Sequence, residues 1–193
     1  MIIKKNIIMM YFSLFVIVIS GIVHFLHRSI SWLDDYLYIM LSERGGSLEA
    51  YLLVILFLLP ILSLGVAFVA YRRNPAHPLV PLFITLSLTF GSISLIAGGN
   101  GMIEYHFSIF MVLAALAYFE QTKLILISTV IFAIQHLGGY FTVPGLVCGI
   151  ADYPFSVLLI HAVFLIFTSA VIILQIQVRQ SYYAQLKKEK DQY

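Results

Sequence analysis

The sequence predicts an all-α integral membrane protein, a six-helix bundle with both termini in the cytoplasm. The first observation behind this prediction is composition: 61% of the 193 residues are hydrophobic and only 10% are charged. A water-soluble domain of this length needs far more polar surface to cover its core. The second observation is that apolar segments of about 17–25 residues, the length of a membrane-spanning helix, alternate with short polar segments. Together they predict a multi-pass protein of the cell membrane, surrounded by lipid.

The first three predicted spans are separated by charged or turn-forming segments, which break a membrane helix. The first span follows Lys4 and Lys5 and is too long for the hydrophobic region of a signal peptide, so we expect it to be retained. The aromatic residues after it predict a short helix at the membrane interface, and they are Trp32, Tyr36 and Tyr38. The sequence "RRNPAHP" separates the second span from the third. The predicted ranges are residues 6–26, 50–71 and 79–97.

The last three predicted spans are bounded in the same way. "GGNG" precedes the fourth span, "EQTK" separates it from the fifth, and a segment with two prolines and two glycines separates the fifth from the sixth. The predicted ranges are residues 103–119, 124–141 and 154–177. Residues 1–178 therefore form one membrane domain. Residues 179–193 are polar, and we expect them to continue the sixth span as a cytoplasmic helix that leads to an output domain after residue 193.

The positions of Lys and Arg orient the bundle, because cytoplasmic loops carry an excess of these residues. With the N-terminus inside, only Arg28 and Arg44 lie on the outer side. The cytoplasmic side then holds the rest, namely Lys4, Lys5, Arg72, Arg73, Lys123, Arg179, Lys187, Lys188 and Lys190. Both termini are therefore predicted to be cytoplasmic.

Four histidines on four predicted helices lie at a similar depth in the outer half of the membrane. At ~1.5 Å per helical residue they fall within roughly the outer 5–12 Å of the hydrocarbon core. They are His24, His106, His136 and His161. Ionisable groups inside a membrane usually face the bundle interior and mark a functional site. The alternative is that each is a hydrogen-bonded packing residue. His77 lies outside this layer.

Two polar residues accompany these histidines in sequence. Glu104 is two residues before His106, about 200° around a helix, so the two cannot face the same point from a regular helix. Glu104 can instead accept a proton from a ligating imidazole of another helix. The alternative is a charge that the helix N-terminus favours. Gln135, beside His136, allows the same two interpretations.

The histidines suit two kinds of cofactor. Two imidazoles from facing helices can ligate haem b axially, and His27 and Arg28 at the rim would then pair with its propionates. Three or four converging imidazoles would instead suit a Cu or Zn ion, with Glu104 or Cys148 as possible additions. Haem is favoured because aromatic residues accompany the histidines, namely Phe107, Phe110, Phe132, Tyr140 and Phe164. The distance between the imidazoles would decide.

The segment "EYHFSIFMVLAALAYFEQTKLILISTVIFAIQHLGGYF" resembles the N-terminal six-helix membrane domains of bacterial signalling proteins, such as methyl-accepting chemotaxis transducers and diguanylate cyclases. Such domains carry an "E-M-H-F-H-F-F" stretch and, further along, "L-H-H-G". Glu104, His106 and Phe107 match the first motif, and His136 matches the second histidine of the later one. Ser108 and Gln135 replace histidines, which puts a site that needs those ligands in doubt. The resemblance implies a sensory domain with His106 and His136 as the matched pair.

No phosphate-binding loop or nucleophile motif occurs in the sequence, so we do not expect an enzyme. We expect a sensor that relays ligand or redox state to a cytoplasmic output domain, as a homodimer and without a nucleic-acid partner. One alternative is a membrane redox protein with a b-type haem or a metal. It would need a second centre nearer the cytoplasm, where no span carries a histidine. A small transporter is the third possibility, and it would need polar groups through the midplane.

Overall fold

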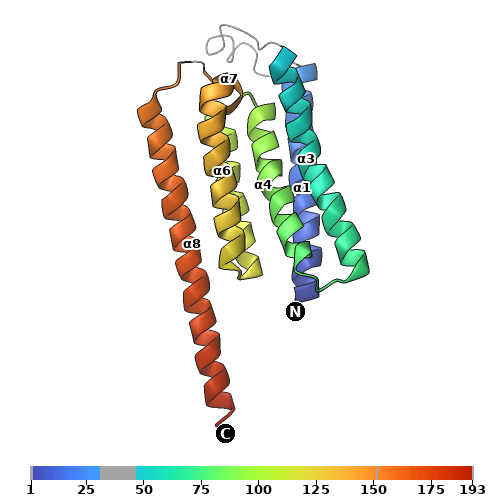
Figure 1. Ribbon diagram of the computed structural model, residues 1–193, viewed down its shortest axis with the longest axis vertical. Helices are drawn as coiled ribbons and strands as arrows, with labels where there is room; N and C mark the ends of the chain where they lie inside the picture. The colour runs from blue at the N-terminus through green and yellow to red at the C-terminus, as the bar shows by residue number, and fades with distance from the viewer. Residues whose placement is uncertain (1, 31–46, 151, 193) are drawn as a thin grey trace.

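The computed structural model describes residues 2–30, 47–150 and 152–192, and within these ranges every regular element is a helix (Figure 1). Five of the helices are long and apolar enough to cross a membrane. The prediction of an all-α fold of membrane-protein type is therefore confirmed. The predicted interfacial helix with Trp32, Tyr36 and Tyr38 lies outside the described residues.

The first half of the protein consists of three long helices, α1 (Ile2–Ser29), α3 (Ser47–Arg73) and α4 (Leu79–Gly98). In the second half, α5 (Ile103–Leu116) ends in a 3-10 turn, η1 (Ala117–Phe119), and is followed by α6 (Thr122–Thr142) and the short α7 (Pro144–Val147). The last helix, α8 (Phe155–Lys190), is the longest. α5 with η1 covers Ile103–Phe119 and is shorter than the five long helices.

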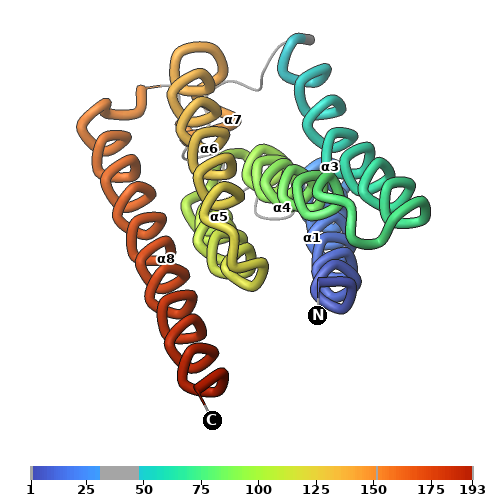
Figure 2. The backbone as a smooth tube through the Cα atoms, turned by 60° about the horizontal axis from the view of Figure 1, so that its bottom comes forward, coloured from blue at the N-terminus to red at the C-terminus, as the bar shows by residue number. Residues whose placement is uncertain are grey.

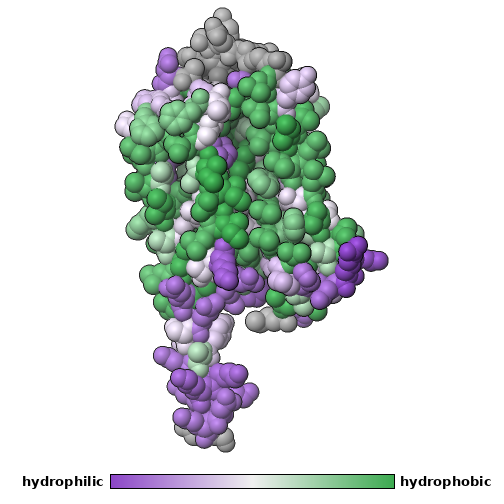
Figure 3. Space-filling model, viewed as in Figure 1, coloured by the Kyte–Doolittle hydropathy of each residue, from purple (hydrophilic) through white to green (hydrophobic). Residues whose placement is uncertain are grey.

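In the described part of the chain the main helices α1, α3, α4, α5, α6 and α8 run alternately up and down, so that both chain ends lie at the same end of the bundle (Figure 1). α8 stands at one side and α1 and α3 stand at the other, with α4 between them (Figure 2). The C-terminal part of α8 continues beyond the apolar body of the bundle, and its surface there is hydrophilic (Figure 3).

α4 is the central helix, and it contacts α1, α3, α5, α6 and α7. Small hydroxyl side chains let membrane helices approach closely and hydrogen-bond across the interface. α4 carries five of them that are fully buried, namely Thr85, Ser87, Thr89, Ser92 and Ser94. The Oγ atoms of Ser92 and Ser108 lie 2.5 Å apart and join α4 to α5. Thr89 and Ser128 join α4 to α6 in the same way, at 2.8 Å.

The outer surface of the bundle is apolar, as lipid requires. Large hydrophobic side chains are exposed on α1, α3, α6 and α8, for example Phe15, Leu62, Ile134 and Phe167. A water-soluble protein rarely exposes contiguous apolar patches larger than a few hundred Å². On the face shown in Figure 3 this apolar surface forms a band across the body of the protein, with hydrophilic residues at its lower end. The band supports contact with a lipid bilayer.

Glu120 joins three segments at the lower end of the bundle. Its carboxylate accepts a hydrogen bond from Lys5 of α1 at 2.9 Å and from Arg179 of α8 at 3.2 Å. Its backbone carbonyl also accepts a hydrogen bond from Gln180 at 2.8 Å. The loop before α6 therefore ties the start of α1 to the point where α8 leaves the bundle.

Candidate functional site

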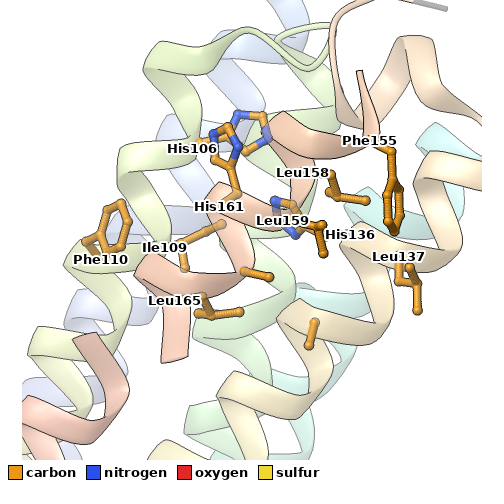
Figure 4. A pocket seen from close by; sticks show the side chains of 12 residues that line it. His106, Ile109, Phe110, His136, Leu137, Phe155, Leu158, Leu159, His161 and Leu165 are labelled. Atoms are coloured by element: carbon orange, nitrogen blue, oxygen red, sulfur yellow. The ribbon is translucent and has the colours of Figure 1, made fainter. Parts of the chain in front are cut away.

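Three of the four predicted site histidines meet in the upper half of the bundle. His106 on α5 lies between His136 on α6 and His161 on α8 (Figure 4). The ring centres of His106 and His136 are 5.3 Å apart, and those of His106 and His161 are 5.8 Å apart. Three different helices, α5, α6 and α8, therefore place three imidazoles together.

The same local hydrogen bond fixes all three rings. A helical side chain points back toward the N-terminus of its helix, so the Nδ1 atom of a histidine can reach the carbonyl four residues earlier. His106, His136 and His161 each place Nδ1 at 3.0 Å from that carbonyl, which belongs to Met102, Phe132 and Val157 respectively. Since a carbonyl can only accept, Nδ1–H is the donor in each case. In the neutral imidazole, Nε2 then keeps its lone pair and can act as a ligand.

A cavity of about 170 Å³ adjoins the three imidazoles (Figure 4). Its walls come from α5, α6 and α8, and apart from the three histidines every lining side chain is apolar. None of the described residues that line the cavity offers the carboxylates that Mg²⁺ or Ca²⁺ would need as ligands. Of the aromatic residues that the sequence suggested for the walls, only Phe110 lines it, together with Phe155, which was not foreseen. Phe107 and Phe164 instead face outward, 64% and 58% exposed.

The fourth predicted histidine, His24, does not join this cluster. Its ring lies against Phe57 of α3, and its Nε2–H donates to the carbonyl of Ser94 on α4 at 3.0 Å. The neutral ring then has its lone pair on Nδ1, opposite to the other three histidines. Equal depth in the membrane was not sufficient to predict convergence, because α1 packs against α3 and α4, whereas the cavity lies between α5, α6 and α8.

The predicted rim residues His27 and Arg28 also lie away from the cavity. The Nε2 atom of His27 is 2.9 Å from the Tyr105 hydroxyl, and its ring packs edge-on against Tyr105. Arg28 donates to the side-chain carbonyl of Asn100 at 2.6 Å. His27 therefore fastens the upper end of α1 to the start of α5, and Arg28 fastens it to the segment between α4 and α5. Neither residue lines the cavity.

The two predicted outer partners of the imidazoles have different positions. Glu104 is exposed in the first turn of α5, and within the described residues it makes no hydrogen bond to an imidazole. This position agrees with a charge that the helix N-terminus favours. Gln135 is half-buried, and its Oε1 atom is buried without a hydrogen-bond partner among the described residues. Backbone carbonyls thus accept the Nδ1 protons of the three imidazoles, the role that we had expected of Glu104 and Gln135.

Two further residues border the histidines from above. The Tyr153 hydroxyl lies 3.4 Å from Nδ1 of His161, and the carbonyl of Val147 on α7 faces the His106 ring. Gly139 of α6 lets α7 pack closely against α6, because it has no side chain. A Cβ atom at Gly139 would lie only 2.3 Å from the side chain of Val147. No sequence motif indicates these neighbours, since they come from the irregular connection between α6 and α8.

The ring separations match those of imidazoles that share one ion. With metal–nitrogen distances of about 2.0–2.1 Å, two imidazoles on one tetrahedral or trigonal ion have ring centres roughly 5–6 Å apart. In the present conformation, however, no three His, Cys, Asp or Glu side chains among the described residues form a ready set of metal ligands. The rings therefore have to turn or the helices have to close before three nitrogens meet at one point.

Comparison with protein-family models, with curated proteins and with solved structures finds no match to this chain. The resemblance of residues 104–141 to bacterial sensory domains therefore stays a prediction.

Proposed function

We propose that the protein is the membrane sensory module of a signalling receptor and that His106, His136 and His161 hold one transition-metal ion in it. The observation that carries this proposal is the shared hydrogen-bond pattern of the three rings, which in each neutral imidazole puts the lone pair of a possible ligand on Nε2. A histidine that ligates a metal almost always donates its other N–H to a carboxylate, a carbonyl or water. The three rings come from three helices, and each neutral ring presents the same nitrogen, Nε2, as the possible ligand.

A metal ion fits these residues better than a haem does. Pockets for molecules of drug size have volumes of about 300–1,000 Å³, and a haem belongs in that class. The cavity beside the histidines has only about 170 Å³. A macrocycle would also have to lie between its two axial imidazoles, where the rings of His106 and His136 already pack at 5.3 Å. No step in the proposed function therefore depends on haem.

Imidazole nitrogen suits zinc, copper, iron and nickel. Of these, we propose zinc or copper. Zinc accepts three histidines in a nearly tetrahedral site, and copper also binds imidazole nitrogen. A site with three protein ligands keeps a further position open for a small molecule. This open position would let the ion report a stimulus.

The signal would travel along α8. Ligation has to bring His161 of α8 toward His106 and His136, so an occupied site favours a closed arrangement of α5, α6 and α8. A ligand shifts such an equilibrium only through its different affinity for the two states. α8 runs without interruption from the site to Lys190, and it can therefore carry a displacement to a signalling domain in the cytoplasm.

We further propose that the protein crosses the cell membrane six times with both termini in the cytoplasm. α5 has 14 residues and η1 has three. Together they are at the short end of the ~17–25 residues of a membrane span. The lower end of the bundle, where both chain ends lie (Figure 1), includes the start of α1 with Lys5 and the end of α3 with Arg72 and Arg73. Arg179 pairs with Glu120 at the same end. This charge distribution supports a cytoplasmic lower end.

We also propose that two copies associate through the protruding part of α8. Val178, Tyr182 and Leu186 recur there at four-residue spacing and are 59%, 58% and 42% exposed. Apolar residues at this spacing lie on one face of a helix and would be covered in a dimer.

Metal analysis of the purified protein tests the site. The expected result is one zinc or copper ion per chain, lost when any one of the three site histidines is replaced by alanine. The loss of affinity should exceed the roughly 10–100-fold effect of removing an outer partner of a ligand. His24→Ala is the matched control, since His24 is a membrane histidine that does not line the cavity. An absorption spectrum with a Soret band would reject the ion in favour of haem, and equal metal loss in the control would reject the site.

A further inference from the structure

The cavity beside the three histidines opens between α6 and α8. Four of its lining residues belong to these two helices and are exposed at the surface, namely Ala133, Leu137, Phe155 and Leu159. Leu137 and Leu159 are 51% and 52% exposed, and Phe155 is 45% exposed. The same side chains therefore face both the interior of the cavity and the surroundings of the protein, which places the mouth between them.

The surroundings of this mouth are lipid-facing. On α6, the neighbouring Ile134 and Phe141 are 66% and 70% exposed. On α8, Ile160 and Val163 are 53% and 64% exposed. A charged or strongly polar molecule would have to pass this apolar surface without any polar group to replace its water, which is costly. A molecule that dissolves in hydrocarbon would pay no such cost.

The size and the chemistry of the cavity restrict its occupant. A cavity of about 150 Å³ lined by Leu, Ile and Phe stays dry and binds benzene or xenon. The present cavity has about 170 Å³ and a wall of the same kind, interrupted only by the imidazoles of His106, His136 and His161. It therefore has room for one small apolar molecule, but not for a molecule of drug size.

We propose that this cavity binds a small apolar molecule, such as a diatomic gas or a ring of benzene size, that enters from the bilayer between α6 and α8. The binding itself needs only the cavity and its mouth. Its role as the stimulus rests on the proposed function, because the occupant would then lie beside the open position of the ion. The lipid bilayer concentrates such molecules, so a lateral entrance gives the site direct access to them.

Xenon binding to the full chain in lipid nanodiscs, after treatment with a chelator, tests the proposal. With ¹³C-labelled alanine methyl groups, the resonances of Ala133 and Ala162, which line the cavity, should shift and reach saturation as the xenon pressure rises. The resonance of Ala170, exposed on α8 away from the cavity, should change only in proportion to pressure, as expected for gas dissolved in lipid. Saturable shifts support the cavity site. Proportional shifts at all three alanines would overturn it, and so would contacts of Ala133 with a lipid chain that xenon does not displace.

The route of entry is tested with two relaxation agents in the same sample. Oxygen, which dissolves in the bilayer, should enhance the relaxation of the Ala133 methyl group, whereas a gadolinium chelate dissolved in the water should not. Strong relaxation by the chelate would show that the cavity opens to water and would overturn the lateral entrance.

A filled cavity provides the matched comparison. Ala162→Phe places a large side chain in the cavity and should abolish saturable xenon binding, while Ala170→Phe, on the same helix, should leave it unchanged. Saturable binding that survives Ala162→Phe would contradict the assignment. Because xenon binding is measured without metal, it separates the two proposals. Xenon binding without metal binding would remove the proposed function and keep the cavity site, and metal binding without xenon binding would do the reverse.

Discussion

At the scale of single residues, one hydrogen bond separates the four histidines that the sequence placed in one layer into two kinds. His106, His136 and His161 donate from Nδ1 to a carbonyl of their own helix, whereas His24 donates from Nε2 to a carbonyl of another helix. The first arrangement leaves the outer nitrogen of the ring available, and the second uses it to hold α1 against α4. The same residue type at the same depth is therefore a candidate ligand in one place and a packing residue in the other.

A single glycine tests the packing role of His24. A Cβ atom on Gly98 would lie 2.4 Å from Cδ2 of His24, so the Gly98→Ala variant has to displace this ring and weaken its hydrogen bond to Ser94. We expect a loss of about 1–3 kcal/mol in the free energy of unfolding, the usual cost of overpacking. Thermal or denaturant unfolding in detergent measures this loss.

Gly138→Ala is the control, because no atom lies within 4 Å of the Cβ position at Gly138. Alanine stabilises a helix relative to glycine by about 0.5–1 kcal/mol, so this variant should be as stable as the wild type or slightly more so. If both variants lost stability equally, the close contact between Gly98 and His24 would not be the cause.

At the scale of helices, hydroxyl pairs fix the register of α1 against α4. The Oγ atoms of Ser13 and Ser87 are 2.6 Å apart, and those of Ser20 and Ser94 are 2.9 Å apart. Both pairs join residues 74 positions apart in the chain, which is possible only if the two helices run parallel. The interval of seven residues along each helix is two turns, so the pairs lie on one face of each helix.

A double-mutant cycle on Ser13 and Ser87 tests this interface. Hydrogen bonds between membrane helices contribute about 0.6 kcal/mol on average. We therefore expect Ser13→Ala and Ser87→Ala to be coupled by about that amount in the free energy of unfolding. Ser13→Ala combined with Thr129→Ala should be additive, since Thr129 bonds to Ser169 of α8 and not to α1. A coupling of zero in the first cycle would contradict the pairing.

The link between α1 and α8 through Glu120 is expected to depend on pH. The hydrogen bond from Lys5, and after it the bond from Arg179, lower the pKa of Glu120 below its ordinary value of 4.5. Because the pKa is lower in the folded protein, the interaction stabilises the fold above pH 4.5 and is lost as the pH falls through the folded-state pKa. The contribution is about 1 kcal/mol or less, as for other ion pairs near the surface.

Unfolding measured between pH 7 and pH 3 tests this expectation. The Glu120→Gln variant should be less stable than the wild type at pH 7, and the difference should become smaller as the pH falls toward 3. Glu189→Gln changes an exposed carboxylate near the end of α8 and should keep the pH profile of the wild type. A difference between Glu120→Gln and the wild type that is the same at pH 7 and at pH 3 would show that shape, and not charge, explains the loss.

At the scale of the whole molecule, polar groups lie at the two ends and apolar surface lies between them (Figure 3). The α3–α4 turn and both chain ends are at the lower end, and the connection from α7 to α8 is at the upper end (Figure 1). The proposed topology places the lower end in the cytoplasm. The site histidines then lie in the half of the membrane that is nearer the outside.

Labelling of single cysteines in intact cells with a membrane-impermeant maleimide tests this orientation. The native thiol is removed first by Cys148→Ala, although burial raises the pKa of Cys148 to about 11 and already makes it a poor nucleophile. Asp152→Cys, exposed at the upper end, should react in intact cells. Ala76→Cys, exposed in the α3–α4 turn, should react only after permeabilisation. If Ala76→Cys reacted in intact cells and Asp152→Cys reacted only after permeabilisation, the proposed orientation would be wrong.

The membrane-protein character of this chain and the approximate limits of its helices followed from the sequence, because both depend on local properties. An apolar segment of sufficient length has to satisfy its backbone hydrogen bonds within a helix when it lies in lipid. Hence the predicted range 79–97 and the observed α4, Leu79–Gly98, nearly coincide. His106 and His136 could likewise be selected as candidate site residues from their local sequence, since a histidine is unusual in an apolar helix.

Which helices adjoin one another was decided only by the tertiary structure. The sequence placed His24 at the same depth as the other three histidines, but depth is one coordinate, and the positions of the helices within the membrane plane are set by long-range contacts. The hydroxyl pairs of α4 hold α1 on the side away from α8, so His24 meets Ser94 while His161 meets His106. The tautomer of His24 was likewise beyond the sequence, because it depends on the Ser94 carbonyl that the folded chain brings to the ring.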